Sequence, residues 1–346
     1  MISNLCVFFG KNVAIAGIVS GSILCTGLSN AHAADDATLA FSAGFLTDPF
    51  QAVLVQKSLD AAKAAGFKVL PAANANGDAG KQIADVQNLI AAGAQVMLVN
   101  PTDSRAIVPA LAMAGQAGIP VVTVDAAPAS GKVAMIVRAD NSKMGEQACQ
   151  SVGKAIGGKG KVLSLMGDQA TTNGRDRTTG FNECMKASFP AVEIIEQPTN
   201  WKADRASAAA QTVLNSNPDL AAIYLQSDSV MLAGVLNVLK GAGRDAPVGA
   251  PDHIYLASID ATPFALDQIR AGKLDVAISQ PLDLYIKYGV AYAKDAVAGK
   301  TDFKPGPTDH GSEIVLLGDN PMDLLPAAAV TKANVEDPAL WGNAAR

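Results

Sequence analysis

The feature that most constrains the fold is a regular alternation, from about Ala37 onwards, of short β-branched runs with longer stretches of helical period. This alternation is typical of βαβ units, in which helices cover both faces of a parallel sheet. It predicts strands at residues 38–44, 68–72, 95–100, 120–125, 133–139, 161–166, 192–197, 221–226, 255–260 and 274–279. It predicts helices at 50–65, 80–92, 104–118, 143–156, 175–188, 202–216, 230–242 and 263–271. The rhythm restarts after residue 139 without a long linker, which indicates an α/β fold of two doubly wound parallel-sheet lobes.

Polar side chains stand where several of these apolar strands end. They are Asp48, Asp125, Ser227, Asp260 and Gln280. Ligands of open α/β sheets bind at the carboxyl ends of the strands, so these side chains are candidates for a binding cleft. Each carboxylate alone could simply cap a helix. Their recurrence at corresponding places favours the cleft.

The N-terminal segment predicts export. Lys11 precedes an apolar run over residues 13–23, and Ala31-His32-Ala33 has the small-x-small pattern that signal peptidase cuts, here before Ala34. A membrane anchor is the alternative, but the apolar run is short for a bilayer span. Residues 1–33 are therefore expected to be a cleaved signal peptide, and the mature chain to be exported.

Size and composition narrow the class of protein further. About 312 residues remain after cleavage, which is more than one core usually serves and indicates about two domains. The chain is 49% hydrophobic and 17% charged, with a net charge of -5. Disorder, a nucleic-acid surface and a basic membrane-binding face are not indicated by these values.

The mature chain keeps two cysteines, Cys149 and Cys184. Export to an oxidising compartment favours a disulfide between them, whereas two buried free thiols are the alternative.

The sequence has few residues or motifs that could bind a metal or catalyse a reaction. Only His253 and His310 remain after processing, and no Cys-x-x-Cys pair is present, so no cofactor or transition metal is expected. No nucleophile elbow or dinucleotide fingerprint is present either. A carboxylate pair such as Asp125 and Asp260 could in principle serve glycoside hydrolysis.

Several short stretches, taken in order and spacing, give the chain a family resemblance. They are Asn100-Pro101-Thr102-Asp103-Ser104, Gly118-Ile119-Pro120-Val121-Val122, Asp140-Asn141, Arg175-Asp176-Arg177 with Gly180-Phe181, and Asp260-Ala261-Thr262-Pro263. Over nearly all of the mature chain, the sequence resembles the periplasmic ribose-binding group of ABC-importer solute-binding proteins, which are related to the sensor domains of LacI-type repressors.

That resemblance implies interleaved lobes joined by a hinge of three segments. The crossings are expected near Ala139, Gln280 and Ser312. One lobe would hold residues 35–139 plus 281–311, and the other 140–280 plus 312–346.

The resemblance also implies the roles of the binding residues. Phe50 and Trp201 would stack on the carbon skeleton of a sugar, and Arg177 would donate to two oxygens at once. The hydroxyl network would be completed by the polar strand-end residues Asp48, Asp125, Ser227, Asp260 and Gln280. Arg175 is expected to be structural.

Departures from the ribose-receptor pattern favour a ligand other than ribose, such as a linear polyol or another small monosaccharide. Gln51 replaces an aromatic residue, Ala126 replaces an arginine, and Ser227 replaces an asparagine. Arg138 could supply a relocated guanidinium, with an interlobe salt bridge as its alternative role.

These observations predict a monomeric periplasmic receptor that captures a small sugar or polyol by hinge closure and delivers it to an ABC permease in the inner membrane. The alternatives are a sensor that presents the sugar to a chemoreceptor or kinase and, with less support, a carbohydrate-active enzyme. No nucleic-acid partner is expected.

Overall fold

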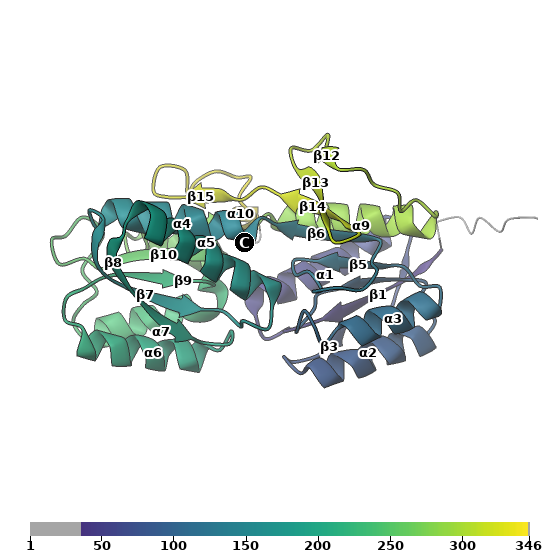
Figure 1. The fold of residues 1–346 in the computed structure, drawn as a ribbon, viewed down its shortest axis with the longest axis horizontal. Coiled ribbons are helices and arrows are strands. Elements are labelled where there is room, and N and C mark those ends of the chain that lie inside the picture. The colour runs from purple at the N-terminus through teal and green to yellow at the C-terminus, as the bar shows by residue number, and fades with distance from the viewer. Residues whose placement is uncertain (1–35, 345–346) are drawn as a thin grey trace, which may run out of the picture. The chain divides into compact units, whose positions relative to one another are not determined.

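The computed structural model describes residues 36–344 and contains two sheets, each covered by helices on both faces (Figure 1). We call the first sheet with its helices the first lobe and the second sheet with its helices the second lobe. The prediction of an α/β fold with two parallel-sheet lobes is confirmed. The predicted signal peptide, residues 1–33, lies outside the described residues.

The first lobe is built around a sheet of order β12-β13-β14-β6-β5-β4-β1-β2, with β3 also paired to β1. Its strands are β1 (Thr38–Ala43), β2 (Lys68–Val69), β3 (Ala73–Asn74), β4 (Val96–Val99), β5 (Val121–Val124), β6 (Met135–Ala139), β12 (Gly306–Pro307), β13 (Glu313–Leu317) and β14 (Asn320–Leu325). Its helices are α1 (Pro49–Ala64), α2 (Ala79–Ala91), α3 (Val108–Gln116) and α9 (Leu282–Val297). Helices α1 and α9 pack on one face of the sheet, and α2 and α3 on the other (Figure 1).

The second lobe is built around a sheet of order β15-β11-β10-β9-β7-β8. Its strands are β7 (Lys159–Met166), β8 (Ala191–Pro198), β9 (Leu220–Leu225), β10 (Tyr255–Asp260), β11 (Val276–Ser279) and β15 (Ala328–Val330). Its helices are α4 (Asn141–Ala155), α5 (Thr172–Ser188), α6 (Ala203–Ser216), α7 (Asp228–Gly241), α8 (Pro263–Arg270) and α10 (Trp341–Ala344). Helices α4 and α5 lie on one side of the sheet and α6 and α7 on the other (Figure 1).

The expected strands and helices up to β11 are present with bounds shifted by a few residues. The strand expected at 68–72 is split into β2 and β3, which pair with different parts of β1. Strands β4, β5, β6 and β11 are buried along their whole length, because helices cover both of their faces.

The chain crosses between the sheets three times. Two crossings lie near Ala139 and Gln280, where β6 leads into α4 and β11 leads into α9. The third differs from the expected place near Ser312, because β13 and β14 stay in the first sheet. Strand β14 pairs parallel to β6 from Met322 opposite Ile136 onwards, so the crossing follows Leu325 and ends at β15.

Helices α4 and α5 make the most extensive helix–helix contact in the described residues, and a disulfide between Cys149 and Cys184 joins them. Close packing is possible because glycines stand at the crossing. A Cβ built on Gly145 would lie 2.4 Å from the Arg177 carbonyl oxygen, and one on Gly180 would lie 2.0 Å from the Ser142 carbonyl oxygen. The helix that carries Arg177 is therefore held rigidly against its neighbour.

Among residues 36–344, no helix combines the length and apolar character that crossing a bilayer requires.

Candidate functional site

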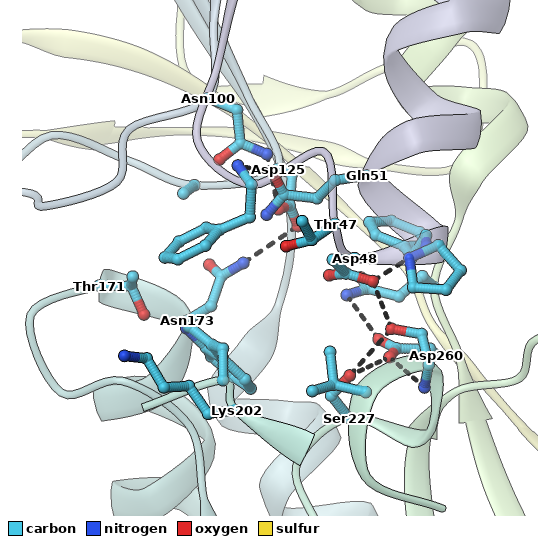
Figure 2. A pocket seen from close by; sticks show the side chains of 18 of the residues that line it. Thr47, Asp48, Gln51, Asn100, Asp125, Thr171, Asn173, Lys202, Ser227 and Asp260 are labelled. Atoms are coloured by element: carbon cyan, nitrogen blue, oxygen red, sulfur yellow. Dashed lines mark hydrogen bonds between the residues drawn. The ribbon is translucent and has the colours of Figure 1, made fainter. Parts of the chain in front are cut away.

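A cavity of about 560 Å³ lies at the carboxyl ends of strands from both sheets. Its lining includes nine of the ten ligand-binding residues expected from the sequence: Asp48, Phe50, Gln51, Asp125, Arg177, Trp201, Ser227, Asp260 and Gln280. Its volume lies in the range of small-molecule sites. Figure 2 shows side chains of the first lobe, among them Asn100, Asp125 and Asp48, opposite Asn173, Ser227 and Asp260 of the second.

The turn between β1 and α1 brings Asp48, Phe50 and Gln51 to the cavity. Asp48 is the N-cap of α1 and accepts a hydrogen bond from the Phe50 backbone N–H at 2.9 Å, while Pro49 starts the helix. The side chain of Gln51 accepts from the Phe45 N–H at 3.0 Å. These local bonds fix the turn, so its side chains reach the cavity in set directions.

Phe50 is only 2% exposed and is held by other aromatic rings. It packs edge to face against Tyr285, at 6.4 Å between ring centroids, and against Trp341, at 5.7 Å. The indole N–H of Trp341 donates to the Asp260 carbonyl oxygen at 2.8 Å. The wall that Phe50 forms is therefore tied to the strand end of the other lobe.

Asp125 follows β5 in the left-handed region, with φ of 69°, and is buried. Its two carboxylate oxygens accept hydrogen bonds from the amides of Asn100, at 3.1 Å, and Asn173, at 3.0 Å. Asn100 follows β4, whereas Asn173 lies in the first turn of α5 in the second lobe, so Asp125 connects the two lobes (Figure 2).

Arg138 was expected as a cavity residue and does not line the cavity. Its guanidinium donates to the Asn173 side-chain oxygen at 3.0 Å and forms an ion pair with Asp176 at 2.8 Å. Arg138 lies in β6 of the first lobe and Asp176 in α5 of the second, so this ion pair is the interlobe salt bridge that was considered as the alternative role of Arg138. A guanidinium engaged in this way lies behind Asn173 and is not free for a ligand.

Asp260 ends β10 and collects polar contacts from three segments. One carboxylate oxygen accepts from the Ser227 hydroxyl at 2.7 Å and from the Ser229 N–H at 3.3 Å. The other accepts from the Gln280 amide at 3.4 Å and lies 3.9 Å from the Arg177 guanidinium. Gln280 is itself oriented by the Tyr285 hydroxyl at 2.8 Å.

Arg177 is buried and anchored by the second lobe. Its Nε donates to the Asn141 side-chain oxygen at 2.7 Å, and a terminal nitrogen donates to the Gln226 carbonyl at 2.5 Å. Its Cζ lies 5.7 Å from the centroid of the Trp201 ring, a cation–π distance. The arginine and the indole therefore form one preorganised unit.

Trp201 reaches the cavity from the loop after β8, where Asn200 and Trp201 both have positive φ, at 53° and 55°. The ring packs against Gly167, the residue after β7. A Cβ at Gly167 would lie 1.9 Å from the indole, so no other residue fits there without moving the ring. The glycine thus decides where the ring can lie.

The carboxyl groups around the cavity have raised pKa values. Burial, reinforced by the charge of Asp260, raises the pKa of Asp48 to about 7. Burial also raises the pKa of Asp125 and of Asp260, although the Arg177 guanidinium opposes both shifts. The pKa of Asp228, buried behind Asp260, is raised to about 7 by burial and by the charge of Asp260. Such shifts in a cavity are typical of functional sites.

The residues that shape the cavity but were not among the expected ligand-binding residues include Phe45, Asn100, Asn173 and Gly167. Asn100 directly follows a buried strand, so the strand-end rule could have found it. Gly167 follows β7, and a glycine after a strand can mark a close approach. Asn173 and Phe45 had no comparable local signal.

No group of three or more histidine, cysteine or acidic side chains in the described part of the chain could hold a metal ion. The arrangement offers a flat indole, one guanidinium and many hydrogen-bond acceptors, which suits a polyhydroxylated molecule.

Comparisons with known proteins agree with this chemistry. The family described as the periplasmic binding protein domain matches residues 39–301. The ribose import binding protein of Escherichia coli is 31% identical over 287 residues, covering 83% of this chain and 93% of that protein. The xylitol-binding protein of Mycolicibacterium smegmatis is 29% identical over 236 residues, covering 68% and 65%. A crystal structure of the Caulobacter myo-inositol binding protein, bound to myo-inositol, aligns with a TM-score of 0.75 at 26% identity, covering 86% of this chain and 94% of that one.

Proposed function

This chain belongs to the periplasmic binding protein domain family, and we propose that it captures a small monosaccharide or polyol in the cavity between its lobes. Members of the family bind substrates and do not transform them, so the chain is a binding protein and not a carbohydrate-active enzyme. Its partner is the permease of an ABC importer, to which the loaded protein delivers the ligand.

The observation that carries the proposal is the convergence of complementary groups from both lobes on one cavity. The Trp201 ring offers an apolar face for C–H surface, and Arg177 offers N–H donors. Asp48, Asp125 and Asp260 offer acceptors for hydroxyl groups. A buried hydroxyl must find a partner, and the amides of Asn173 and Gln280 supply donors and further acceptors.

The cavity also explains why two lobes are needed. Asp48 in the first lobe accepts a hydrogen bond from the Ser229 hydroxyl in the second at 2.5 Å, and Asp125 accepts from Asn173. A ligand that bonds to the same carboxylates would bridge the lobes in the same way. Ligand binding would then stabilise the form in which the lobes are together, which is how a hinged receptor signals occupancy.

The class of ligand is supported by the relatives. Their names specify ribose, xylitol and myo-inositol, which are all small, uncharged and polyhydroxylated. The single indole face and the many acceptors of this cavity suit a molecule of this size. We propose a pentose, a hexose or a polyol, with ribose itself disfavoured by Gln51 and Ala126.

Thermal-shift and calorimetric titrations of the purified protein with pentoses, hexoses and polyols test the proposal. A cognate ligand should raise the melting temperature, because it binds only the folded state. Arg177→Ala and Trp201→Ala should abolish the shift. Lys186→Ala is the matched control, because Lys186 is an exposed cation on the same helix, α5. The proposal fails if no sugar or polyol binds, or if both cavity variants bind as well as the control.

We also propose that residues 1–33 are removed on export to the periplasm and that the mature protein is a monomer without affinity for nucleic acid. The family implies a location outside the cytoplasm. Mass spectrometry of the periplasmic fraction should find Ala34 at the N-terminus. Size-exclusion chromatography with light scattering should give the mass of one chain, and a dimer would contradict the proposal.

A further inference from the structure

The buried side chains that line the cavity carry more negative than positive charge. Asp125 and Asp260 are 4% and 2% exposed, and Asp48 is partly buried beside them. Arg177, at 2% exposure, is the buried cation among the described residues that line the cavity. Three carboxylates therefore face one guanidinium.

Neutral groups make the close hydrogen bonds to these carboxylates. Asp125 accepts from two side-chain amides, and Asp48 accepts from a backbone N–H and a serine hydroxyl. Asp260 accepts from Ser227, Ser229 and Gln280. Neutral donors stabilise a carboxylate without cancelling its charge.

The guanidinium of Arg177 does not restore the balance. Its described hydrogen bonds end on the neutral oxygens of Asn141 and Gln226, and it approaches Asp260 only to 3.9 Å. Arg138 is engaged by Asp176 outside the cavity lining. At the rim, the exposed side chains of Lys202 and Asp204 carry opposite charges.

The unbalanced charge is concentrated at Asp48 and Asp260. Ser229 bonds to both, with its hydroxyl on Asp48 and its N–H on Asp260, so the two carboxylates lie close together (Figure 2). Burial raises the pKa of both carboxyl groups, and the charge of Asp260 raises the pKa of Asp48 further. Like charges that are brought together out of water are stabilised by any cation that enters beside them.

We propose that the preferred ligand is a polyhydroxylated molecule that carries one ammonium group, an amino sugar or amino polyol, with its nitrogen beside Asp48 and Asp260. This inference rests on the proposed function and specifies the ligand class of the same site. The hydroxyl groups would use Asp125, Asn173 and Arg177, and the Trp201 ring would cover the carbon skeleton.

Matched ligand pairs test the inference by isothermal titration calorimetry at pH 7.5 and physiological salt. Each pair differs only in one hydroxyl replaced by an ammonium: glucose with glucosamine, galactose with galactosamine, and ribitol with 1-amino-1-deoxyribitol. At least one amine should bind ten-fold or more tightly than its parent. In Asp48→Asn this ratio should fall at least ten-fold. Asp252→Asn, which removes the same charge from an exposed residue outside the cavity lining, should keep the ratio.

A measurement on the unmodified protein complements the variants in case Asp48→Asn binds neither compound. Titrations at pH 6.5 in two buffers of different ionisation enthalpy report protons released on binding. The nearby carboxylates of Asp260 and Asp125 help to keep a proton on Asp48 in the free protein. A cation bound beside Asp48 should displace that proton. The amine should release more protons than its parent, because a cation favours the ionised carboxylate more strongly than a hydroxyl donor does.

The outcomes separate this inference from the proposed function. Neutral parents that bind as tightly as the amines, or more tightly, would overturn the ammonium inference and leave the sugar-binding function in place. Equal ratios in the two asparagine variants, or no greater proton release with the amine than with its parent, would also overturn it. If no compound of either series binds but another pentose, hexose or polyol does, the ammonium inference fails and the proposed function stands. If no sugar or polyol binds at all, the proposed function itself fails.

Discussion

Gly167→Ala should weaken ligand binding while leaving the fold intact. The new Cβ would lie 1.9 Å from the indole of Trp201, whereas carbon atoms in contact stand about 3.5–4.0 Å apart, so the ring must move by roughly 2 Å. If about a third of an indole surface of roughly 200 Å² meets the ligand, its displacement removes about 65 Å² of apolar contact. At about 25 cal/mol per Å², this is about 1.6 kcal/mol, or roughly a 15-fold loss of affinity.

The free protein should tolerate this change, because the Trp201 ring is only partly buried and can move towards solvent. Gly153→Ala is the matched control. Its Cβ would lie 2.2 Å from Phe189, another aromatic ring, but at the α4 side of the second lobe and not in the cavity lining. This control should lower the free energy of unfolding by about 1–3 kcal/mol through overpacking and leave affinity unchanged.

Isothermal titration calorimetry and urea unfolding of both variants would separate the two effects. A double-mutant cycle adds a sharper criterion, since Gly167→Ala should have no further effect on affinity once Trp201→Ala has removed the ring. The reasoning is refuted if Gly167→Ala binds with unchanged affinity, or if its effect persists undiminished without the indole.

Three further predictions concern stability and the cavity network. Replacing Cys149 and Cys184 by alanine should lower the free energy of unfolding by about 4 kcal/mol in urea titrations, because the bridge closes a loop with a sequence separation of 35; a loss below about 1 kcal/mol would contradict this. Asn173→Ala removes a donor to buried Asp125 and should weaken binding about ten-fold by calorimetry, so unchanged affinity would count against the role of that amide. The pKa of Asp48 is raised from 3.8 to about 7, so the folded protein holds an extra proton between about pH 4 and pH 7. As the pH rises from about 4 to about 7, its free energy of unfolding should therefore fall by on the order of 4 kcal/mol relative to Asp48→Asn, with parallel pH curves as the contrary result.

The α/β rhythm could be predicted from the sequence because parallel strands covered by helices on both faces are continuous apolar runs. Strands such as β4 and β11 are buried at every residue, so their signal is strong. Strands β12, β13 and β15 are short, partly exposed and paired in antiparallel fashion, so their periodicity is weak. The periodicity therefore predicted no strands in this region, and the third crossing, which the family resemblance implied near Ser312, follows Leu325 instead.

Cavity residues could be predicted from the sequence where they stand at the carboxyl end of a predicted strand, because ligands of such sheets bind there. Asp260 ends β10, while Asp125 and Gln280 directly follow β5 and β11, and parallel strands bring their ends to one edge. Arg138 also stands near a strand end, but whether its guanidinium enters the cavity depends on Asp176, 38 residues later in the sequence. Pairing between distant side chains of this kind has no local signal.

Backbone conformation explains why the remaining detail could not be predicted. Asp125, Asp260, Ala261, Asn200 and Trp201 all have positive φ, a region that residues other than glycine rarely occupy and that is typically strained by about 1–3 kcal/mol each. Such residues persist only where their surroundings hold them, and here amide donors, serine hydroxyls and Gly167 do so. Local propensity therefore fails at the strand ends that build the cavity. The same contacts that hold the strained backbone also direct its side chains towards a ligand, which makes this failure itself an indication of the binding site.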